Sequence, residues 1–330
     1  MTFARICAAW TVCAALTLAA ADARADPTFA QFIAGVRAEA MAAGIAQGTL
    51  DEAFAGITEP IARVIELDRS QPEVTMTFAE YMAKRVSDAM IHDGRAKLAA
   101  NAHLLSMVEA NYDVPKELLV ALWGLESRFG EYQGDYSVIG ALATLAYDGR
   151  RSEFFRTELL DALGILDEGH VRASLMLGSW AGAMGQNQFM PSSFRSYAVD
   201  FNGDGRRDIW GTLADVLASA ANYMARAGWH LGEPWGMPVI LPAGFDAARI
   251  GNREIEDVGT WRRLGVTPRA GRDFPPDATA AALVRPAGDN GMTYMVFRNY
   301  QAILRWNRSD YFAMSVVTLA DLVAEPGSQP

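Results

Sequence analysis

The segment PKELLVALWGLESRFG, residues 115–130, gives the clearest helix prediction in the chain. Proline suits the first helical position, where an N–H is not needed, and glycine suits the position after the last turn. We therefore expect a helix that starts at Pro115 and stops at Gly130. Helical periodicity broken by glycine and proline also covers residues 29–107 and continues over residues 114–229. The fold around this segment is predicted to be mainly α.

One carboxylate lies on an unexpected face of this helix. Glu126 shares a stripe with apolar side chains, because Leu119 and Leu122 precede it by seven and four residues and Phe129 follows it by three. Loss of water around the carboxylate would raise its pKa, as a general acid that works near neutral pH requires. The alternatives are a buried glutamate paired with Arg128 or another arginine, and a glutamate at the helix end that reaches solvent.

A second segment, GSWAGAMGQNQFMPSSF at residues 178–194, combines small residues with neutral polar ones. Glycine and alanine permit close approach of the backbone, while serine, glutamine and asparagine suit sugar hydroxyls and N-acetyl groups. Taken alone, the segment fits better a loop that leads into a helix capped by serines. Its functional interpretation depends on the first segment.

The sequence pattern changes after residue 233, where proline and glycine become frequent. Short β-like runs are predicted at residues 237–241, 280–285 and 292–297, and the turn Asp289-Asn290-Gly291 joins the last two as a hairpin. A final helix is predicted over residues 311–323. The expected fold class is mainly α (α+β), with a small inserted antiparallel β domain.

Residues 200–211 are similar to a calcium-binding EF-hand loop. Oxygen-bearing side chains stand at loop positions 1, 3, 5 and 9, and glycine stands at position 6. Position 12 is Gly211 where a bidentate glutamate is usual, position 8 is Arg207, and Asp215 further along offers the missing carboxylate. The alternative is a plain Asp/Gly turn without a metal. The candidate metal ligands are Asp200, Asn202, Asp204, Arg206, Asp208 and Asp215.

The N-terminal residues 1–25 read as an export signal, with Arg5 before an apolar stretch and a small-x-small cleavage site that ends at Ala25. Both cysteines, Cys7 and Cys13, fall inside this segment. The exported chain would then have no thiol for a disulfide, a zinc site or a nucleophile. No lipid-accepting cysteine stands at the cleavage site, so we expect a free periplasmic protein.

Composition and missing motifs exclude several classes of function. The hydrophobic content of 51% allows a large core, and the formal net charge of −10 argues against nucleic acid, which needs a basic surface. The chain contains no HExxH, GxSxG, P-loop or GxGxxG motif, and its four histidines show no pairing at ligand or triad spacing. Metalloproteases, serine hydrolases and nucleotide-dependent enzymes are poor interpretations.

Together, the segments at residues 122–130 and 178–193 closely resemble the B family of lytic murein transglycosylases. The resemblance covers nearly the whole chain after the predicted signal. Supporting matches are FAEY at residues 78–81, YDGRR at 147–151, ANYM at 221–224, WNRS at 306–309 and YFAM at 311–314.

The resemblance implies a lysozyme-like α core and a division of the chain into regions. After the signal at residues 1–25, a helical N-terminal region would cover residues 26–107. The catalytic core would comprise residues 108–232 and 295–330 and would carry the EF-hand-like loop at 200–215. A β insertion would cover residues 233–294.

The resemblance also implies roles for residues around the cleft. Glu126 would be the catalytic acid/base, with Ser179, Gln188 and Asn307 lining the cleft around it. Trp306 stands where the family pattern has tyrosine. Stacking on a sugar would survive that change but a hydroxyl contact would not, so we favour Asn307 over Trp306.

Four further positions match residues that contact the glycan in the family. Tyr81 and Tyr223 match aromatic positions bordering the glycan subsites, with ordinary core aromatics as the alternative. Arg150 and Arg151 match a basic pair that would grip carboxylates of muramic acid or of the stem peptide. A solvated pair at a helix start is the alternative for these arginines.

The activity implied by the resemblance is cleavage of the β-1,4 bond between N-acetylmuramic acid and N-acetylglucosamine, with a 1,6-anhydro sugar as product. An enzyme of this kind needs no cofactor for the chemistry and can hold a structural Ca²⁺. Its substrate would be the glycan strands of peptidoglycan, and other cell-wall enzymes are candidate partners. The nearest acids to Glu126, Glu131 and Asp135, lie beyond the helix stop and are not convincing second catalysts. The alternatives are a glycoside hydrolase of peptidoglycan or chitin-type polymers and a non-catalytic glycan-binding scaffold.

Overall fold

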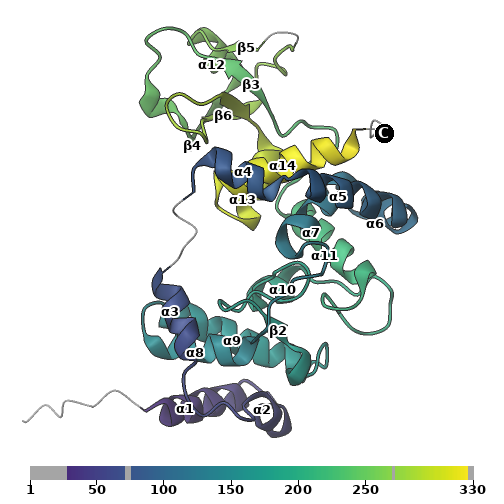
Figure 1. Cartoon of the computed structure of the whole chain (residues 1–330), viewed down its shortest axis with the longest axis vertical. Helices are drawn as coiled ribbons and strands as arrows, with labels where there is room; N and C mark the ends of the chain where they lie inside the picture. Colours follow the sequence, from purple (N-terminus) through teal and green to yellow (C-terminus); the bar gives the residue numbers. More distant parts are fainter. Residues whose placement is uncertain (1–27, 71–75, 270–271, 326–330) are drawn as a thin grey trace, which may run out of the picture.

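The computed structural model describes residues 28–70, 76–269 and 272–325. The molecule is elongated, with helices at one end, a sheet at the other and the helix predicted from residues 115–130 between them (Figure 1). In these described ranges no helix is long and apolar enough to cross a membrane. The predicted export signal lies outside the described residues.

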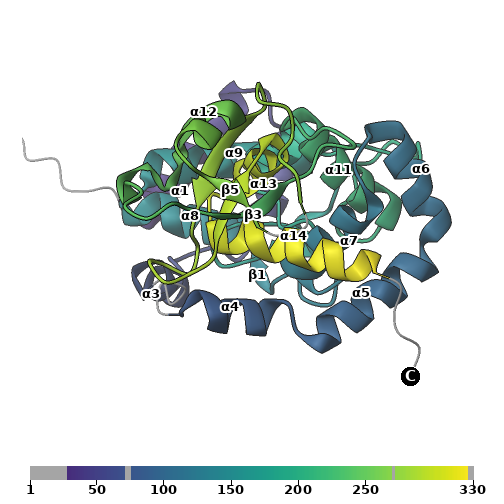
Figure 2. The same cartoon turned by 90° about the horizontal axis from the view of Figure 1, so that it is seen from above.

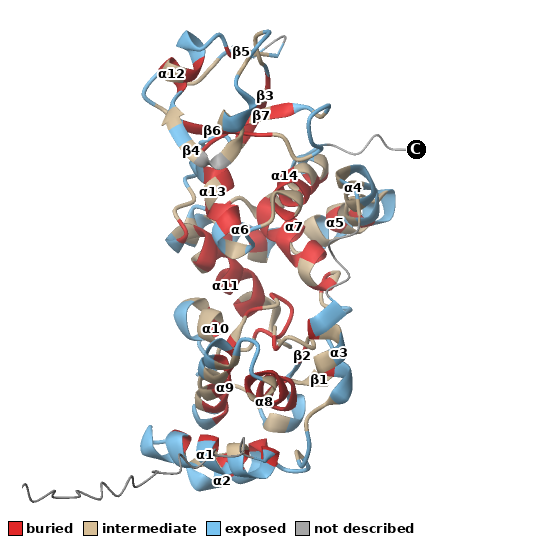
Figure 3. Cartoon of the chain, turned by 90° about the vertical axis from the view of Figure 1, so that its left-hand side faces the viewer, coloured by how far each residue is buried: buried red, intermediate tan, exposed pale blue. Residues whose placement is uncertain are grey.

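The helical end of the molecule is organised around α8 (Val138–Asp148) and α9 (Ser152–Asp167), which pack against each other. The first nine residues of α8 are all buried, since its sequence is almost wholly apolar. The N-terminal helices, by contrast, bury one stripe each and expose the rest (Figure 3). These covering helices are α1 (Phe29–Ala42), α2 (Gln47–Ala53) and α3 (Ala62–Ser70).

The middle of the molecule is built around α7 (Lys116–Ser127). Nine of its 12 residues are buried, because helices pack against it on several sides. Figure 2 shows an arc of helices passing around the side of α14 and α7. The surrounding helices are α4 (Phe78–Arg85), α5 (Asp88–Ala100), α6 (Ala102–Tyr112), α11 (Leu213–Arg226) and α14 (Asp310–Ala324).

The helix α7 ends earlier than the predicted stop at Gly130. Its last residue is Ser127, and Arg128, Phe129 and Gly130 follow with left-handed φ angles of 48°, 59° and 86°. Such angles are unfavourable for residues other than glycine, so the surrounding structure must hold this turn. The Ser127 hydroxyl contributes by accepting a hydrogen bond from the Gly130 N–H at 3.0 Å. Glu126 consequently lies in the last turn of α7.

The second segment forms a compact loop against a two-stranded sheet. Strand β1 (Tyr136–Ser137) pairs antiparallel with β2 (Leu177–Gly178), and the chain then folds back through isolated bridges to Met184. The helix that follows, α10 (Pro191–Tyr197), begins at a proline and has no side-chain cap. The interpretation of this segment as a helix start capped by serines is therefore wrong. Instead, the Ser192 hydroxyl donates to Glu158 Oε1 at 2.7 Å.

The far end of the molecule contains a five-stranded antiparallel sheet in the order β4-β6-β7-β3-β5. The three predicted strands are present, and β6 pairs with β7 as the predicted hairpin. Two further strands were not predicted. With α12 (Val258–Arg263) the sheet encloses a small core around Trp261. The strands are β3 (Gly236–Ile240), β4 (Gly251–Asp257), β5 (Thr267–Pro268), β6 (Ala280–Val284) and β7 (Thr293–Val296).

The chain returns from this sheet to the helical core through α13 (Arg298–Trp306) and then α14. The predicted last helix, residues 311–323, agrees with α14 to within one residue at each end. Two short 3₁₀ segments, Ala173–Leu175 and Ala247–Arg249, complete the described elements. The prediction of a mainly α fold with a small antiparallel β part is confirmed.

Candidate active site

Glu126 is half-buried in the last turn of α7, where its carboxylate meets an indole. Trp306, the last residue of α13, donates its Nε1–H to Glu126 Oε1 at 2.6 Å. Burial raises the pKa of Glu126 to about 7, and the Trp306 hydrogen bond and the positive charge of Arg85 act in the opposite direction. The carboxyl group is therefore poised between its acid and base forms near neutral pH, as general acid/base catalysis requires.

The pairing of Glu126 with a neighbouring arginine is not what the structure shows. Arg128 instead lies 2.8 Å from Asp93 and 3.3 Å from Glu131. Arg85, on α4, donates to the carbonyl oxygen of Leu125 at 2.7 Å. The cations of the described part of the chain thus leave Glu126 without an ion pair.

A small cavity of about 10 Å³ lies beside Glu126. Most of its lining is apolar, which explains why the charged form of the carboxyl group is disfavoured. One polar side chain other than Glu126 and the two indoles lines it, that of Asn187. The remaining lining residues are Leu119, Leu122, Trp123, Val216, Leu217, Ala220 and Trp306.

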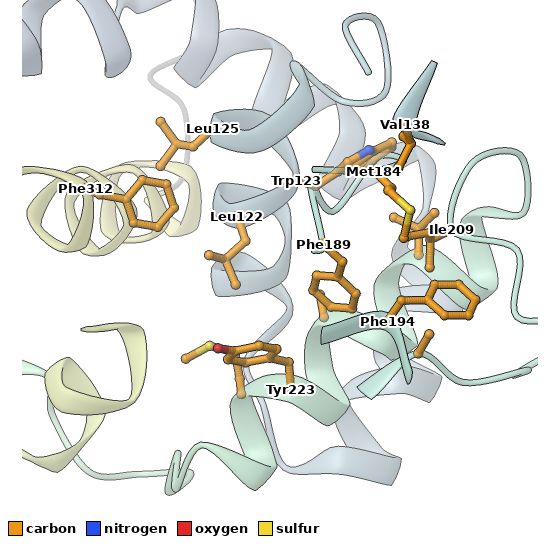
Figure 4. Packing of buried hydrophobic residues seen from close by; sticks show 14 of the residues in the cluster. Leu122, Trp123, Leu125, Val138, Met184, Phe189, Phe194, Ile209, Tyr223 and Phe312 are labelled. Carbon is orange, nitrogen blue, oxygen red and sulfur yellow. The ribbon is translucent and has the colours of Figure 1, made fainter. Parts of the chain in front are cut away.

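Trp306 belongs to a cluster of aromatic rings on this side of the site. Its ring lies 5.2 Å from that of Phe189 and 4.8 Å from that of Tyr223, between ring centroids. Figure 4 shows Phe189 close to Tyr223 in the space between α7 and α11. Tyr223 is 9% exposed, and its hydroxyl donates to the Arg305 carbonyl oxygen at 2.6 Å. Burial raises the pKa of Tyr223 to about 12. These contacts orient the Trp306 indole toward Glu126.

The loop after β2 is fixed by amide side chains. Gln186 accepts a hydrogen bond from Trp123 Nε1–H at 2.7 Å and donates to the Trp210 carbonyl oxygen at 2.9 Å. Gln188, in a left-handed conformation with φ 49°, donates its Nε2–H to the carbonyl oxygens of Gln133 and Gly185 at 3.0 and 2.9 Å. The loop is thereby tied to the segment that follows α7.

Ser179 and Asn307 have local partners. The Ser179 hydroxyl accepts hydrogen bonds from the N–H groups of Ala181 and Ala183, at 3.3 and 3.0 Å. Asn307 is exposed, and its Oδ1 accepts from the Ser309 N–H at 3.1 Å. In the described structure no hydrogen bond joins either residue to Glu126, whereas Trp306 makes one.

Tyr81 is partly exposed on α4, where its ring packs 5.5 Å from that of Tyr311 and 6.0 Å from the Arg85 guanidinium.

Arg150 and Arg151 lie between α8 and α9, and both bind the buried carboxylate of Asp68, at 3.1 and 2.7 Å. Their side chains remain 50% and 43% exposed, so their outer faces reach solvent.

A groove of about 650 Å³ begins at the turn that follows α7. It does not include Glu126 itself, but it runs from Gly130 and Gly134 past Leu177 to Trp210. Arg172 and Arg206 also line it. The groove has the volume of a typical ligand pocket, and Gly130 in its lining is four residues after Glu126 in the sequence.

Sequence reasoning missed four residues around Glu126, of which only Arg85 lies outside the two quoted segments. Arg85 is 41 positions before Glu126, and Asn187 is 61 positions after it. Gln186 and Trp123 lie within the two quoted segments, but neither was chosen. The signal that was available for Gln186 and Asn187 was the excess of polar amides in residues 178–194. A buried amide needs partners, and here the partners are indole N–H groups and backbone carbonyls.

The acidic loop at residues 200–215 is ordered by its own backbone. Asp200 accepts hydrogen bonds from the N–H groups of Gly203, Asp204 and Gly205. Asp215 is fully buried and accepts from the Phe201 and Asp208 N–H groups, at 2.8 and 2.9 Å.

The donors of this loop are oxygens, the type that Ca²⁺ prefers, and the Asp215 carboxylate is joined to the loop through the Phe201 and Asp208 N–H groups. Within the described ranges, however, no three acidic, histidine or cysteine side chains are already gathered as a metal site. The donor types fit calcium, and the side chains of Asn202 and Asp204 already meet, since Asn202 Nδ2 donates to Asp204 Oδ2 at 3.0 Å.

Replacing Trp306 with phenylalanine should raise the pKa of Glu126 further. The indole N–H stabilises the carboxylate form, so its loss favours the protonated form. A hydrogen bond to a charged group is worth about 1.5–3 kcal/mol, which corresponds to about one pH unit or more. The alkaline limb of the kcat/KM pH profile should move upward in Trp306→Phe. A limb that stays in place or moves downward would show that the hydrogen bond does not set this pKa.

The comparisons with known proteins agree with this geometry. The model of the transglycosylase SLT domain family matches residues 28–321. The chain belongs to this transglycosylase family. Membrane-bound lytic murein transglycosylase B of Escherichia coli (strain K12) is 34% identical over 219 residues. That alignment covers 64% of this chain and 58% of the relative, so the chain spans little more than half of that relative's length.

Solved structures of other transglycosylases are similar over most of the chain. SltB3 from Pseudomonas aeruginosa, in complex with NAG-anhNAM-pentapeptide, is 46% identical with a TM-score of 0.85, covering 89% of this chain and 79% of that one. The Escherichia coli lytic transglycosylase SLT35, in complex with calcium, is 29% identical with a TM-score of 0.78, covering 91% and 93%. The lysozyme-like transglycosylase fold expected from the sequence is therefore confirmed.

Proposed function

We propose that this protein is a lytic transglycosylase that cleaves the β-1,4 bond between N-acetylmuramic acid and N-acetylglucosamine in peptidoglycan. The observation that carries the proposal is a single carboxyl group, Glu126, with a pKa of about 7 and no second carboxylate among the described groups that line its cavity or shift its pKa. Family membership and the anhNAM sugar in the complex of SltB3 support the same reaction.

In this mechanism Glu126 acts twice. The protonated carboxyl group first donates its proton to the glycosidic oxygen, and the bond to C1 of the muramic acid breaks. The resulting carboxylate then removes the proton from the C6 hydroxyl of the same sugar, whose oxygen attacks C1 and forms the 1,6-anhydro ring. The Trp306 N–H at 2.6 Å and the charge of Arg85 stabilise the carboxylate between the two steps.

A hydrolase is less compatible with this site. Retaining and inverting glycosidases need a second carboxylate about 5 Å or roughly 6.5–9.5 Å from the first. Glu131, the nearest acid after α7, is bound to Arg128 instead. A glycan-binding scaffold is disfavoured as well, because binding alone does not require a carboxyl group held near its titration point.

Incubation with purified peptidoglycan sacculi separates cleavage of peptidoglycan from cleavage of chitin-type polymers and from binding alone. The transglycosylase proposal expects soluble fragments from sacculi and poor cleavage of chitin oligomers, which lack muramic acid. Equal cleavage of both polymers would favour a general glycoside hydrolase. Binding to sacculi without release of fragments would favour the scaffold.

Contacts to the glycan are part of the proposal. Gln188 and Trp306 are proposed to contact the glycan, which the hydrogen bond of Trp306 to Glu126 supports for the indole. Ser179 and Asn307 are proposed as hydrogen-bonding residues of the cleft, and Tyr81 and Tyr223 as aromatic borders. Arg150 and Arg151 are proposed to bind carboxylates of the substrate through the parts of their side chains that remain exposed beside Asp68.

We also propose that the loop at residues 200–215 binds Ca²⁺ as a structural ion. The oxygen donors of the loop support this, as does the calcium complex of SLT35. The residues that would hold the ion are Asp200, Asn202, Asp204, Arg206, Asp208 and Asp215.

Calcium should therefore raise the melting temperature, and a chelator should lower it, because an ion that binds only the folded chain stabilises it by mass action. A hundredfold excess of Ca²⁺ over its Kd would contribute about 2.7 kcal/mol. Asp204→Ala should abolish the response, while Asp289→Ala, in the turn between β6 and β7, should keep it. Identical melting curves with calcium and with chelator would show that the loop is a plain turn.

The cellular setting follows from the substrate. Peptidoglycan as substrate and the signal-like residues 1–25 support a periplasmic location, and other cell-wall enzymes are proposed as partners. The division into an N-terminal region at 26–107, a core at 108–232 and 295–330, and a β insertion at 233–294 is likewise proposed. The sheet formed by Gly236–Ile240 through Thr293–Val296, with its own small core, supports it.

A further inference from the structure

Asn187 is a buried amide with one end fixed and the other end without a partner. It is 3% exposed in the loop after β2. Its Nδ2–H donates to the Val216 carbonyl oxygen on α11 at 2.8 Å, which determines the orientation of the amide. Its Oδ1 is buried and accepts no hydrogen bond among the described residues. A buried amide oxygen left unpaired costs about 1–3 kcal/mol, so such an atom calls for an explanation.

Asn187 and Glu126 line the same small cavity, and the other polar groups in it are already used. The Trp306 N–H binds Glu126 Oε1, and the Trp123 N–H binds Gln186 Oε1. An indole can only donate, so neither tryptophan can accept a proton from a carboxyl group. Asn187 Oδ1 is therefore the side-chain acceptor that the cavity offers to Glu126.

The neutral form of Glu126 needs such an acceptor. A protonated carboxyl group has an O–H that must be satisfied when it is buried, and Trp306 already binds the oxygen Oε1. The cavity of about 10 Å³ is at the lower limit of the volume that one water molecule needs, and a water there would have the carboxyl group and the amide oxygen as partners.

We propose that Asn187 is a positioning residue for the reaction, whose Oδ1 accepts a hydrogen bond through one cavity water from the protonated carboxyl group of Glu126. Asn187 and Trp306 then act on opposite forms of the same group. Trp306 stabilises the carboxylate that remains after proton donation, and Asn187 stabilises the acid that precedes it. The role of Glu126 as acid/base rests on the proposed function, whereas the water-mediated hydrogen bond between Glu126 and Asn187 does not depend on it.

The groups that face Glu126 from the packed elements leave few competing explanations. The helix α4 contributes the charge of Arg85, and α13 contributes the neutral donor Trp306. The helix α11 presents Val216, Leu217 and Ala220 to the cavity, and α7 presents leucines and Trp123. Among these described residues no other titratable group acts on the carboxyl group.

The test compares two substitutions of Asn187 and reads the pKa of Glu126 directly. Asn187→Leu removes the acceptor at similar volume, whereas Asn187→Asp keeps an oxygen in the place of Oδ1. The readout is the C=O stretch of the protonated carboxyl group in infrared difference spectra across pH, assigned by its absence in Glu126→Gln. Since no turnover is needed, a failure of this proposal is distinct from a failure of the proposed function.

In Asn187→Leu the pKa of Glu126 should fall by about one unit, because the protonated form has lost its acceptor. This fall is opposite to the change that a more apolar cavity would cause by itself. In Asn187→Asp the pKa should stay at the wild-type value or rise. The alkaline limb of the kcat/KM profile should move in the same directions. If Asn187→Leu does not fold, Asn187→Ala removes the same acceptor and should shift the pKa in the same direction.

A matched control separates this role from the structural bond to Val216. Asn222 makes a similar amide bond, from Nδ2 to the Tyr197 carbonyl oxygen at 2.8 Å, and does not line the cavity. Asn222→Leu should lower the melting temperature and leave the pKa of Glu126 unchanged. The proposal is overturned if the pKa stays constant or rises in Asn187→Leu, or if the leucine and aspartate variants shift it equally.

Discussion

Glu126→Gln should abolish turnover while leaving the fold intact. Glutamine has the same shape and its oxygen can still accept the Trp306 N–H, but it can neither give up nor regain the proton. General acid/base catalysis contributes roughly 10²–10⁴ to the rate, and here one group serves in both steps. We expect kcat to fall at least about a hundredfold, measured as the release of soluble fragments from sacculi. A matched change on the same helix, Glu117→Gln, should keep wild-type activity.

The same substitution should stabilise the protein above neutral pH. The pKa of Glu126 is raised to about 7 in the folded state, so the folded chain retains a proton that the unfolded chain releases near pH 4.5. Above pH 7 the buried carboxylate lowers the free energy of unfolding. This loss of stability disappears as pH falls below about 4.5, the pKa of the carboxyl group in the unfolded chain. At pH 8 Glu126→Gln should be more stable by up to about 3 kcal/mol, with no such gain at pH 4. A variant that keeps a tenth of the activity, or shows no pH-dependent gain, would mean that Glu126 is not this group.

Gly134→Ala should cause the largest loss of stability of any single methyl addition near the site. Gly134 has φ 92°, and a Cβ atom there would lie 2.0 Å from the Gly178 carbonyl oxygen and 2.6 Å from the Ser179 nitrogen. Those atoms are backbone and cannot move away without separating the two loops that border the groove. Left-handed strain costs about 1–3 kcal/mol by itself, and the clash adds to it. We expect a loss above about 3 kcal/mol, with a lower melting temperature and reduced activity.

Gly149→Ala is the matched control for this prediction. Gly149 has a similar φ of 86° at the end of α8, but nothing lies within 4 Å of the position that a Cβ would take. It should therefore show the backbone strain alone, about 1 kcal/mol. Equal losses in the two glycine variants, measured by denaturant unfolding, would show that the close approach of Gly134 to Gly178 does not constrain the fold.

Sequence periodicity broken by glycine and proline predicts the helical regions, and it gives the bounds of individual helices for α7 and α14. The helix α7 was located from its flanking Pro115 and Gly130, and α14 from the run at residues 311–323. The end of α7 was placed too late, because Arg128 and Phe129 adopt left-handed angles that side chains rarely take and that no local pattern indicates. The strand β4, with sequence GNREIED, is polar and carries an irregular register, so it lacked the short apolar run that indicated β6 and β7.

The sequence likewise predicts one part of the candidate site and not the rest. Glu126 was identified because a carboxylate within an apolar stripe is visible in the sequence. Its hydrogen bond to Trp306 joins residues 180 positions apart, and nothing in either local sequence reports it. Asn307 was favoured because Trp306 lacks the hydroxyl of the tyrosine in the family pattern, but the structure gives Trp306 the contact with the carboxylate. Asn187 was likewise within a quoted segment, and only the packing of that loop against α7 and α11 shows which amide enters the cavity.

The central claim is that one carboxyl group completes the reaction with the C6 hydroxyl of the substrate in place of water. Mass spectrometry of muropeptides released from purified sacculi, before and after borohydride treatment, tests it most directly. The account predicts fragments that end in 1,6-anhydro-N-acetylmuramic acid, one water lighter than hydrolysis products and unchanged by borohydride. Fragments that end mainly in reducible sugars, and gain two hydrogens on treatment, would contradict it and make the enzyme a hydrolase.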